Sequence, residues 1–183
     1  MKFVGLLLAA GCASRFGSDK LLHPLLHGVP IAVQAARHLK SEISEVLAVV
    51  RPRSEDLSKL LESEGCRVVI CERADEGMGA SLACAVRAAG AADGYLVALA
   101  DMPFVRPTSI AAVRDALATG ARIAAPYFRT RRGHPVGISG TLRVDLETLA
   151  GDEGARGILA AHQSEIVKVP VGDPGVIRDI DRP

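Results

Sequence analysis

The chain has 183 residues, of which 49% are hydrophobic and 3% aromatic, so one compact domain with an aliphatic core is expected over residues 1–183. The 22 Lys and Arg nearly balance the 21 Asp and Glu, which argues against duplex nucleic acid or a membrane surface as partner. No apolar stretch approaches the roughly 20 residues that span a bilayer. The apolar run at 1–10 lacks a secretory cleavage pattern, so a soluble, cytoplasmic protein is predicted.

Four cysteines occur, and their spacing matches neither a C-x-x-C pair nor a zinc pattern. They are Cys12, Cys66, Cys71 and Cys84. We expect them to act as small apolar residues in a reducing compartment.

Short apolar runs alternate with amphipathic segments along the chain. Strands are predicted, in chain order, at 4–8, 46–50, 68–71, 95–100, 123–127, 135–138 and 166–169. Helices are predicted at 30–39, 54–63, 81–89, 107–118, 142–149 and 155–162. Pro30 suits the first turn of its helix, and Ser54 is the expected N-cap of the next. Residues 128–134 are expected to form a mobile loop.

The predicted strands are apolar at consecutive positions, which is typical of strands buried on both faces. Their alternation with helices favours an α/β fold with a mostly parallel sheet between two helical layers. In such folds ligands bind where the carboxyl ends of the strands open into loops. The residues directly after the strands are therefore the candidates for a site.

The loop after the first strand, residues 9–20, combines small residues with two cations, Arg15 and Lys20. Small residues let backbone N–H groups approach an anion closely, so this loop is a candidate phosphate cradle. The spacing of Gly11, Gly17 and Lys20 fits neither the Walker A pattern nor G-x-G-x-x-G. A glycine turn without any ligand is the alternative interpretation.

Acidic residues at two further places are candidate metal ligands. Asp101 ends the buried strand 95–100, where one carboxylate facing the phosphate cradle would hold Mg²⁺, although such an aspartate often only forms a turn. Asp179 and Asp181 occupy alternate positions of the C-terminal segment, so both carboxylates would face one side if it is extended. A frayed polar tail is the alternative for this pair.

At the level of motifs, the whole chain resembles the molybdenum cofactor cytidylyltransferases and the wider MobA-like nucleotidyltransferase family. The first motif of that family is matched by Leu8-Ala9-Ala10-Gly11, Ser14-Arg15-Phe16-Gly17 and Lys20-Leu21-Leu22. The later motifs are matched by Gly77-Met78-Gly79-Ala80-Ser81-Leu82, Leu99-Ala100-Asp101-Met102-Pro103, Arg132-Gly133-His134-Pro135-Val136, Gly151-Asp152-Glu153-Gly154-Ala155-Arg156 and Asp179-Ile180-Asp181. The family fold is a Rossmann-like three-layer α/β/α sandwich.

The resemblance implies a Mg²⁺-dependent nucleotidyltransferase domain that moves a nucleotide from an NTP onto a phosphorylated pterin and releases pyrophosphate. It assigns catalysis to Arg15, Lys20 and Asp101. It assigns nucleotide binding to Leu8, Ala9, Ala10, Gly11, Lys20, Gly77, Gly79, Ser81 and Asp101. Acceptor binding falls to Arg132 and His134, and metal binding to Asp101, Asp179 and Asp181. A molybdoenzyme or its chaperone is a further partner that the resemblance suggests.

Within the family, cytidylyl members tend to have Ala where guanylyl members have a second Gly, so Ala10-Gly11 favours CTP. The chain departs from the family pattern at Cys12 and Ala13, where Gly or Arg are common. It also departs after Asp181, where Arg182 and Pro183 stand in place of a Thr-Pro pair.

Several alternatives stay open. GTP or another NTP, and another phosphorylated acceptor, fit the same family. The alternative for His134 is a structural residue without a ligand. The alternative for Arg129, Arg131 and Arg132 is a basic loop that is simply solvated. A nucleotide-binding module without catalysis would bind NTP but release no pyrophosphate. A dinucleotide-dependent oxidoreductase would need G-x-G-x-x-G and an acidic residue after the second strand, which instead ends at Val50-Arg51-Pro52.

Overall fold

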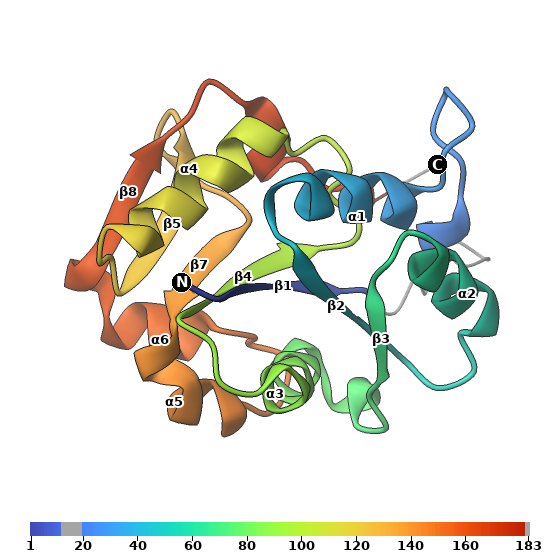
Figure 1. Cartoon of the computed structure of the whole chain (residues 1–183), viewed down its shortest axis with the longest axis horizontal. Coiled ribbons are helices and arrows are strands. Elements are labelled where there is room, and N and C mark those ends of the chain that lie inside the picture. The colour runs from blue at the N-terminus through green and yellow to red at the C-terminus, as the bar shows by residue number, and fades with distance from the viewer. Residues whose placement is uncertain (12–19, 182–183) are drawn as a thin grey trace.

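The computed structural model describes residues 1–11 and 20–181, which form a mixed sheet flanked by helices (Figure 1). Its strands are β1 (Phe3–Leu8), β2 (Glu45–Val50), β3 (Arg67–Ile70), β4 (Gly94–Leu99), β5 (Ile123–Phe128), β6 (Arg131–Arg132), β7 (Val136–Ser139) and β8 (Ile166–Pro170). They lie in the order β3-β2-β1-β4-β7-β5-β6, and β8 pairs with β5. Only β6 and β7, among the described strands, run against the rest, so the sheet is mostly parallel as predicted.

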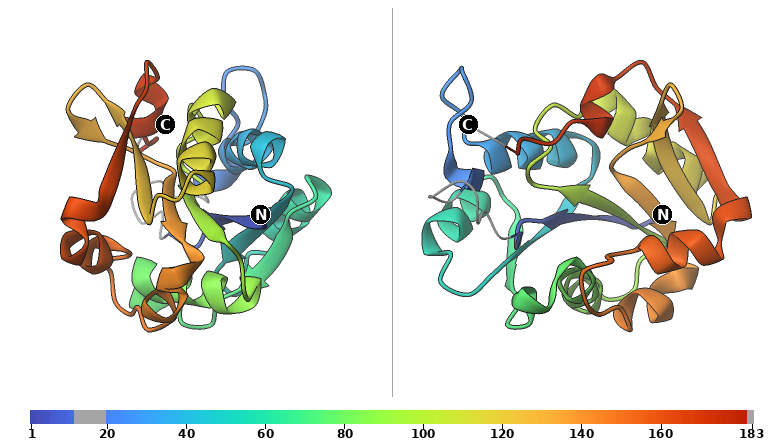
Figure 2. Two further views of the ribbon diagram at one scale, coloured as in Figure 1. Left: turned by 60° about the vertical axis from the view of Figure 1, so that its left-hand side comes forward. Right: turned by 180° about the vertical axis from the view of Figure 1, so that it is seen from behind.

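Helices cover both faces of the sheet, as the two further views also show (Figure 2). They are α1 (Ile31–Glu42), α2 (Glu55–Ser63), α3 (Met78–Ala89), α4 (Pro107–Ala118), α5 (Arg143–Glu147) and α6 (Arg156–Ala161). Short 3-10 turns are η1 (Lys20–Leu22), η2 (Ala74–Glu76), η3 (Gly140–Leu142), η4 (Gln163–Glu165) and η5 (Pro174–Ile177). In the described ranges, no helix has the length and apolar character needed to cross a bilayer.

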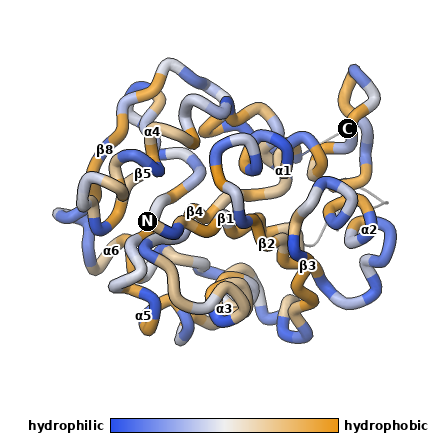
Figure 3. The backbone as a smooth tube through the Cα atoms, viewed as in Figure 1, coloured by the Kyte–Doolittle hydropathy of each residue, from blue (hydrophilic) through white to orange (hydrophobic). Residues whose placement is uncertain are grey.

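The central strands supply two separate apolar cores because successive side chains point to opposite faces. Leu7 of β1 packs with α1, α2 and α4, whereas Leu6 and Leu8 pack with α3, α5 and α6. After its first residue, β1 is buried throughout, and so is β2. The apolar stretches along these strands stand out in Figure 3. The predicted three-layer α/β/α sandwich is therefore the observed architecture.

The predicted elements differ from the structure mainly at α3 and in the segment 128–134. Helix α3 begins at Met78, three positions before the predicted start, because the carbonyl of Gly151 accepts the first-turn N–H of Gly79 at 2.7 Å. Residues Arg131–Arg132 form the short strand β6 in a hairpin with β5 inside the predicted loop. The predicted helix 142–149 divides into η3 and the shorter α5, which ends at Glu147.

The structure differs from two smaller predictions, which concern the starts of α1 and α2. Pro30 is the residue before α1 rather than part of its first turn. Ser54 occupies the N-cap position of α2, but its side chain makes no capping hydrogen bond.

Cys66 and Cys71 are buried in the apolar cores, and burial raises the pKa of the Cys66 thiol to about 11. Cys12 lies outside the described residues.

Candidate active site

A cleft of about 440 Å³ opens at the carboxyl ends of β1, β2 and β4. This is the edge at which the sequence predicted a ligand site. Its walls come from two residues that follow β1, from η1 and η2, from the residues after β2 and β4, from the start of α3 and from the segment around Asp152. The lining residues are Leu8, Ala10, Gly11, Lys20, Leu21, Arg51, Ala74, Asp75, Gly77, Met78, Ser81, Leu99, Asp101 and Asp152.

Lys20 and Asp101 form an ion pair in this cleft, with Lys20 Nζ donating to Asp101 Oδ2 at 2.9 Å. The backbone positions both groups. Lys20 is the first residue of η1, and Asp101 follows Ala100, whose N–H donates to the carbonyl of Leu8 at 3.1 Å. The side chains are only 14% and 26% exposed, so water screens the pair weakly. An accessible, poorly screened cation beside a carboxylate suits the binding of a phosphate and its metal counterion.

Arg51, the residue directly after β2, holds the backbone at Ala10, the second residue after β1. Its guanidinium donates to the carbonyl of Ala10 at 2.9 Å and 3.3 Å, and it lies 3.6 Å from Asp75. In the sequence, Arg51 is only evidence against a dinucleotide site, which needs an acidic residue at the end of the second strand. The signal that would have found it is its position after a buried strand at the ligand-binding edge.

The start of α3 forms another wall of the cleft and is packed tightly by the loop 150–152. A Cβ on Gly77, whose φ is +119°, would lie 2.2 Å from Asp152 Oδ1. A Cβ on Gly79 would lie 2.5 Å from the carbonyl oxygen of Ala150. Ser81 donates through Oγ to the carbonyl of Gly77 at 3.2 Å. The glycines therefore allow close packing of this loop, which brings Asp152, unassigned from the sequence, into the cleft.

The C-terminal segment returns to the same edge of the sheet. The N–H of Ile180 donates to the carbonyl of Asp101 at 3.0 Å, and Asp181 Oδ1 lies 3.9 Å from Lys20 Nζ. Asp179 is exposed. The segment is anchored upstream by Asp173, which is 3% exposed and accepts hydrogen bonds from N–H and O–H groups. These donors are the N–H of Arg106, the hydroxyl of Ser109 and the N–H of Gly175.

The donor set at this edge fits a magnesium ion that keeps most of its ligands as water and phosphate. Two carboxylates, Asp101 and Asp181, lie within 3.9 Å of one ammonium group, so they already form a pocket of negative charge around a cation. Across residues 1–11 and 20–181, no group of three or more His, Cys, Asp or Glu is gathered for a metal. One or two carboxylates with phosphate and water oxygens is the usual way in which proteins hold Mg²⁺.

The two predicted acceptor residues do not line the cleft. His134 begins the segment before β7, where its Nδ1 lies 3.4 Å from the carbonyl oxygen of Val97 and its N–H bonds the carbonyl of Val176 at 2.8 Å. Burial lowers the pKa of His134, because it disfavours the charged imidazolium, and the nearby charge of Arg132 acts in the same direction. Arg132 is exposed on β6. These contacts favour a neutral, structural imidazole.

The structure thus brings together seven of the residues predicted for the nucleotide or for catalysis. They are Leu8, Ala10, Gly11, Lys20, Gly77, Ser81 and Asp101. Ala9 is instead buried, with an exposed fraction of 2%, and Gly79 packs against the loop 150–152. Arg15 falls in the range 12–19, outside the described residues.

A mostly parallel Rossmann-like sheet, with a lysine and an aspartate in a cleft at its carboxyl edge, defines a nucleotide-binding α/β protein. Within that class, the chain belongs to the family of the MobA-like NTP transferase domain, whose model matches residues 5–166. The family named by the motif resemblance is therefore confirmed, and with it the nucleotidyltransferase class.

Two of the similar proteins align with nearly the whole chain, and a third aligns with part of it. The chain is 29% identical over 185 residues to the nicotine blue oxidoreductase of Paenarthrobacter nicotinovorans, covering 97% of this chain and 91% of that protein. It is 30% identical over 190 residues to the purine catabolism protein PucB of Bacillus subtilis, covering 98% and 92%. A molybdenum cofactor guanylyltransferase of Burkholderia ambifaria is 38% identical over 117 residues, covering 62% of this chain and 55% of that protein.

Solved structures agree on the fold. Rv0371c from Mycobacterium tuberculosis superposes with a TM-score of 0.84 at 24% identity, covering 99% of this chain and 93% of that one. Rv0371c in complex with manganese gives a TM-score of 0.79 at 21% identity, covering 93% and 89%. At these identities the likeness establishes the Rossmann-like α/β fold.

Proposed function

We propose that the chain, as one cytoplasmic nucleotidyltransferase domain over residues 1–183, transfers CMP from CTP to the phosphate of a molybdopterin-type cofactor. The observation that carries this proposal is the Lys20–Asp101 ion pair, 2.9 Å long, inside the cleft beside the loop after β1. A cleft of about 440 Å³ has the volume of a small-molecule site. The product would pass to a molybdoenzyme or to its chaperone.

The reaction needs alignment and charge stabilisation rather than a general base. The second pKa of a phosphate monoester is about 6, so the acceptor phosphate is largely a dianion at neutral pH. One of its oxygens bonds to the α-phosphorus of CTP, the bond from that phosphorus to the bridging oxygen breaks, and pyrophosphate leaves with the electron pair. Lys20 and Arg15 would neutralise charge on the phosphates, and the backbone at Ala10 and Gly11 would orient them.

Mg²⁺ would be held by Asp101 together with a carboxylate of the tail, Asp181 or Asp179. When bound, it would neutralise charge on the triphosphate and its leaving group. The manganese complex named for Rv0371c supports a divalent cation for proteins of this fold. Lys20 would then exchange Asp101 for a phosphate oxygen, since a lysine ammonium can serve either partner.

Selection of CTP would depend on Ala10. Its methyl group belongs to the core beneath the cleft, with Leu8, and its carbonyl is held by Arg51. A glycine there would enlarge the floor of the cleft by one methyl group, which favours the larger base of GTP. Ala10→Gly should therefore raise kcat/KM for GTP relative to CTP, on the order of tenfold, because pocket differences of this size discriminate by about 1–3 kcal/mol.

The names of two relatives indicate activities other than cytidylyl transfer. The Burkholderia ambifaria protein is named a guanylyltransferase, which favours GTP. The Paenarthrobacter nicotinovorans protein is named an oxidoreductase. The residues after β1 and β2 in this chain, Gly11 and Arg51, lack the pattern that a dinucleotide site of the Rossmann type uses.

The deciding experiment offers each of the four NTPs with Mg²⁺ and either molybdenum-loaded or metal-free phosphorylated pterin, and measures pyrophosphate. CTP with one pterin form should give the highest rate. Ala10→Gly is run in parallel, with Ala161→Gly at the end of α6 as a matched control outside the cleft. Tight NTP binding without pyrophosphate would indicate a binding module. Absorbance of NAD(P)H, followed in the same samples, would reveal an oxidoreductase instead.

A further inference from the structure

A second concavity, of about 360 Å³, lies between α6 and the strands β5, β6 and β8. We call it the basic pocket. Its polar lining consists of Tyr127, Arg132, Arg156, Gln163 and Lys168, over a floor that includes Leu159. Three of these residues are cations, and none of the lining residues that the structure describes is a carboxylate.

The backbone register explains why three of these side chains face the same side. Arg132 lies directly opposite Tyr127 across the β5–β6 pair, and Lys168 is in register with Ala125 across the β5–β8 pair. Ala125 and Tyr127, two positions apart on β5, both pack toward the core that contains α6. Partners in register project to the same face, so Arg132 and Lys168 project toward α6. The Lys168 ammonium lies 5.5 Å from the centre of the Tyr127 ring, consistent with this arrangement.

Arg156 lines the basic pocket on the side of α6. It belongs to the motif 151–156, from which one residue lines the nucleotide cleft. In the motif 151–156, Asp152 lines the nucleotide cleft, whereas Arg156 begins α6 and faces the basic pocket. One short loop therefore connects the walls of the two concavities. Gly154, with φ at +56°, turns the chain between them.

Among the described residues, no carboxylate balances the charge in the basic pocket. Nearby arginines are paired: Arg122 lies 2.9 Å from Glu165, and Arg143 lies 2.6 Å from Glu147. Arg132, Arg156 and Lys168, in contrast, form no ion pair with any carboxylate in the described part of the chain. Convergent cations without a carboxylate partner attract a multiply charged anion, and arginine forks match phosphate oxygens especially well.

We propose that the basic pocket binds a phosphate-class polyanion, separately from the nucleotide in the Lys20–Asp101 cleft. Arg132 and Arg156 bind its oxygens through their guanidinium groups, Lys168 adds a point charge, and Gln163 donates from its amide. The anion belongs either to the far end of the acceptor or to a free phosphate compound.

Isothermal titration with inorganic pyrophosphate, without metal and at low salt, tests this site independently of catalysis. The wild-type protein should bind at two classes of site. Arg156→Gln/Lys168→Gln should weaken one class about tenfold or more, because hydrogen bonds to charged groups contribute that much each. Lys20→Ala should weaken the other class only.

Arg53→Gln/Lys59→Gln is the matched control, since it removes the same charge from exposed residues that line neither concavity. Both binding classes should survive in it. Unchanged pyrophosphate binding in the Arg156→Gln/Lys168→Gln protein overturns the proposal, as does an equal loss in the control.

The source of the anion follows from competition in the same titration. If phosphorylated pterin displaces pyrophosphate from the class that depends on Arg156 and Lys168, the basic pocket serves the acceptor. If the pterin leaves that class unaffected, a free phosphate compound is the ligand. Either result supports an anion site there, and both stand even if no nucleotidyl transfer is detected.

Discussion

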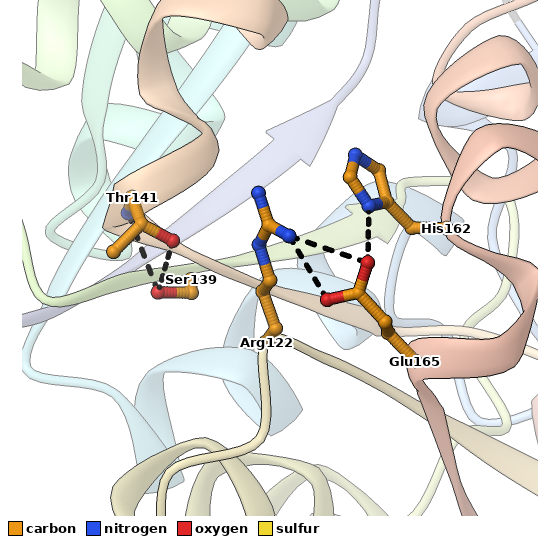
Figure 4. A network of polar contacts seen from close by, with 5 residues as sticks. All are labelled: Arg122, Ser139, Thr141, His162 and Glu165. Atoms are coloured by element: carbon orange, nitrogen blue, oxygen red, sulfur yellow. Dashed lines mark hydrogen bonds and ion pairs between the residues drawn. The ribbon is translucent and has the colours of Figure 1, made fainter.

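Two clusters of charged side chains lie at opposite ends of the parallel strands. At the carboxyl end, Lys20 and Asp101 pair at 2.9 Å with exposed fractions of 14% and 26%. At the other end, Glu165 accepts from Arg122 at 2.9 Å and contacts His162 at 2.6 Å, in the network drawn in Figure 4. Arg122 and Glu165 are 43% and 40% exposed there, and neither lines a cavity described above.

The contrast shows that the environment of an ion pair, more than its geometry, indicates its use. Desolvation costs a buried pair much of its Coulomb gain, so Lys20–Asp101 contributes little net stability. The pair lies in a cleft, where Lys20 would gain a phosphate partner and Asp101 a metal partner. The exposed cluster is screened by water and joins the starts of β5 and β8. Substitutions at the two ends should therefore affect different measured quantities.

Asp101→Asn should have the largest effect. The amide keeps the size of the carboxylate but loses its charge, so pyrophosphate release should fall about 100-fold or more while the Tm hardly changes. The measurements are steady-state pyrophosphate release and thermal unfolding. Asp145→Asn, at an exposed aspartate of α5, is the matched control. Wild-type turnover by a folded Asp101→Asn protein would remove Asp101 from the site.

Lys20→Ala should come next. Loss of a charge-assisted contact to phosphate costs about 1.5–3 kcal/mol, which corresponds to roughly tenfold to a hundredfold in kcat/KM for the NTP. Arg15→Ala is expected to act similarly, although Arg15 lies outside the described residues. Lys59→Ala, on the exposed face of α2, controls for the loss of one charge. Unchanged kinetic constants in both Lys20→Ala and Arg15→Ala would place the phosphate cradle elsewhere.

Much of the fold was predictable because burial dominates it. Strands such as β1 and β2 are apolar at almost every position, and α4 was predicted with its observed bounds, Pro107–Ala118. The parts that were missed depend on tertiary contacts. Strand β6 consists of two arginines, whose pairing with β5 leaves no apolar pattern. Helix α3 begins at Met78, and the N–H of Gly79 in its first turn is satisfied by the carbonyl of Gly151 in a distant loop.

The candidate site divides in the same way. The motifs predicted Lys20 and Asp101, and the rule on strand ends predicted that they would meet. Asp152 and Arg51 were not assigned, because their places in the cleft depend on a loop packed against Gly77 and on a bond to the carbonyl of Ala10. Such contacts join segments far apart in the chain, and no local spacing indicates them.

Substitutions in the C-terminal segment test whether magnesium binding in the cleft needs both Asp101 and Asp181. Because chain ends fray, the sequence alone favours Asp179 slightly over Asp181 as the residue that matters for the metal, whereas in the structure Asp181 lies 3.9 Å from Lys20. Asp181→Asn should raise the half-saturating Mg²⁺ concentration on the order of tenfold, and Asp179→Asn less, because an ionised oxygen ligand is lost. Mg²⁺ titrations of pyrophosphate release in both variants and the pair are the measurement. A double variant with wild-type Mg²⁺ dependence would show that Asp101 works with water and phosphate oxygens alone.

The exposed cluster should give the smallest effect, and an effect on stability only. The hydrogen bond with His162, and then that with Arg122, holds the pKa of Glu165 below its usual value. A carboxylate with a lowered folded pKa contributes stability that is complete above its unfolded pKa, about 4.3, and is lost as the pH falls through the folded value. Glu165→Gln should therefore lower the Tm by about 1–3 °C near neutral pH and by progressively less in more acidic buffer.

Differential scanning calorimetry of Glu165→Gln between about pH 3 and pH 7 measures this dependence. Glu62→Gln, an exposed residue of α2 at the other side of the sheet, should show no such trend. Pyrophosphate release by Glu165→Gln should equal that of the wild type, because the cluster lies at the end of the strands away from the cleft. A loss of activity at unchanged Tm would mean that the two ends are coupled and that the exposed cluster also positions β5 and α6 for the basic pocket.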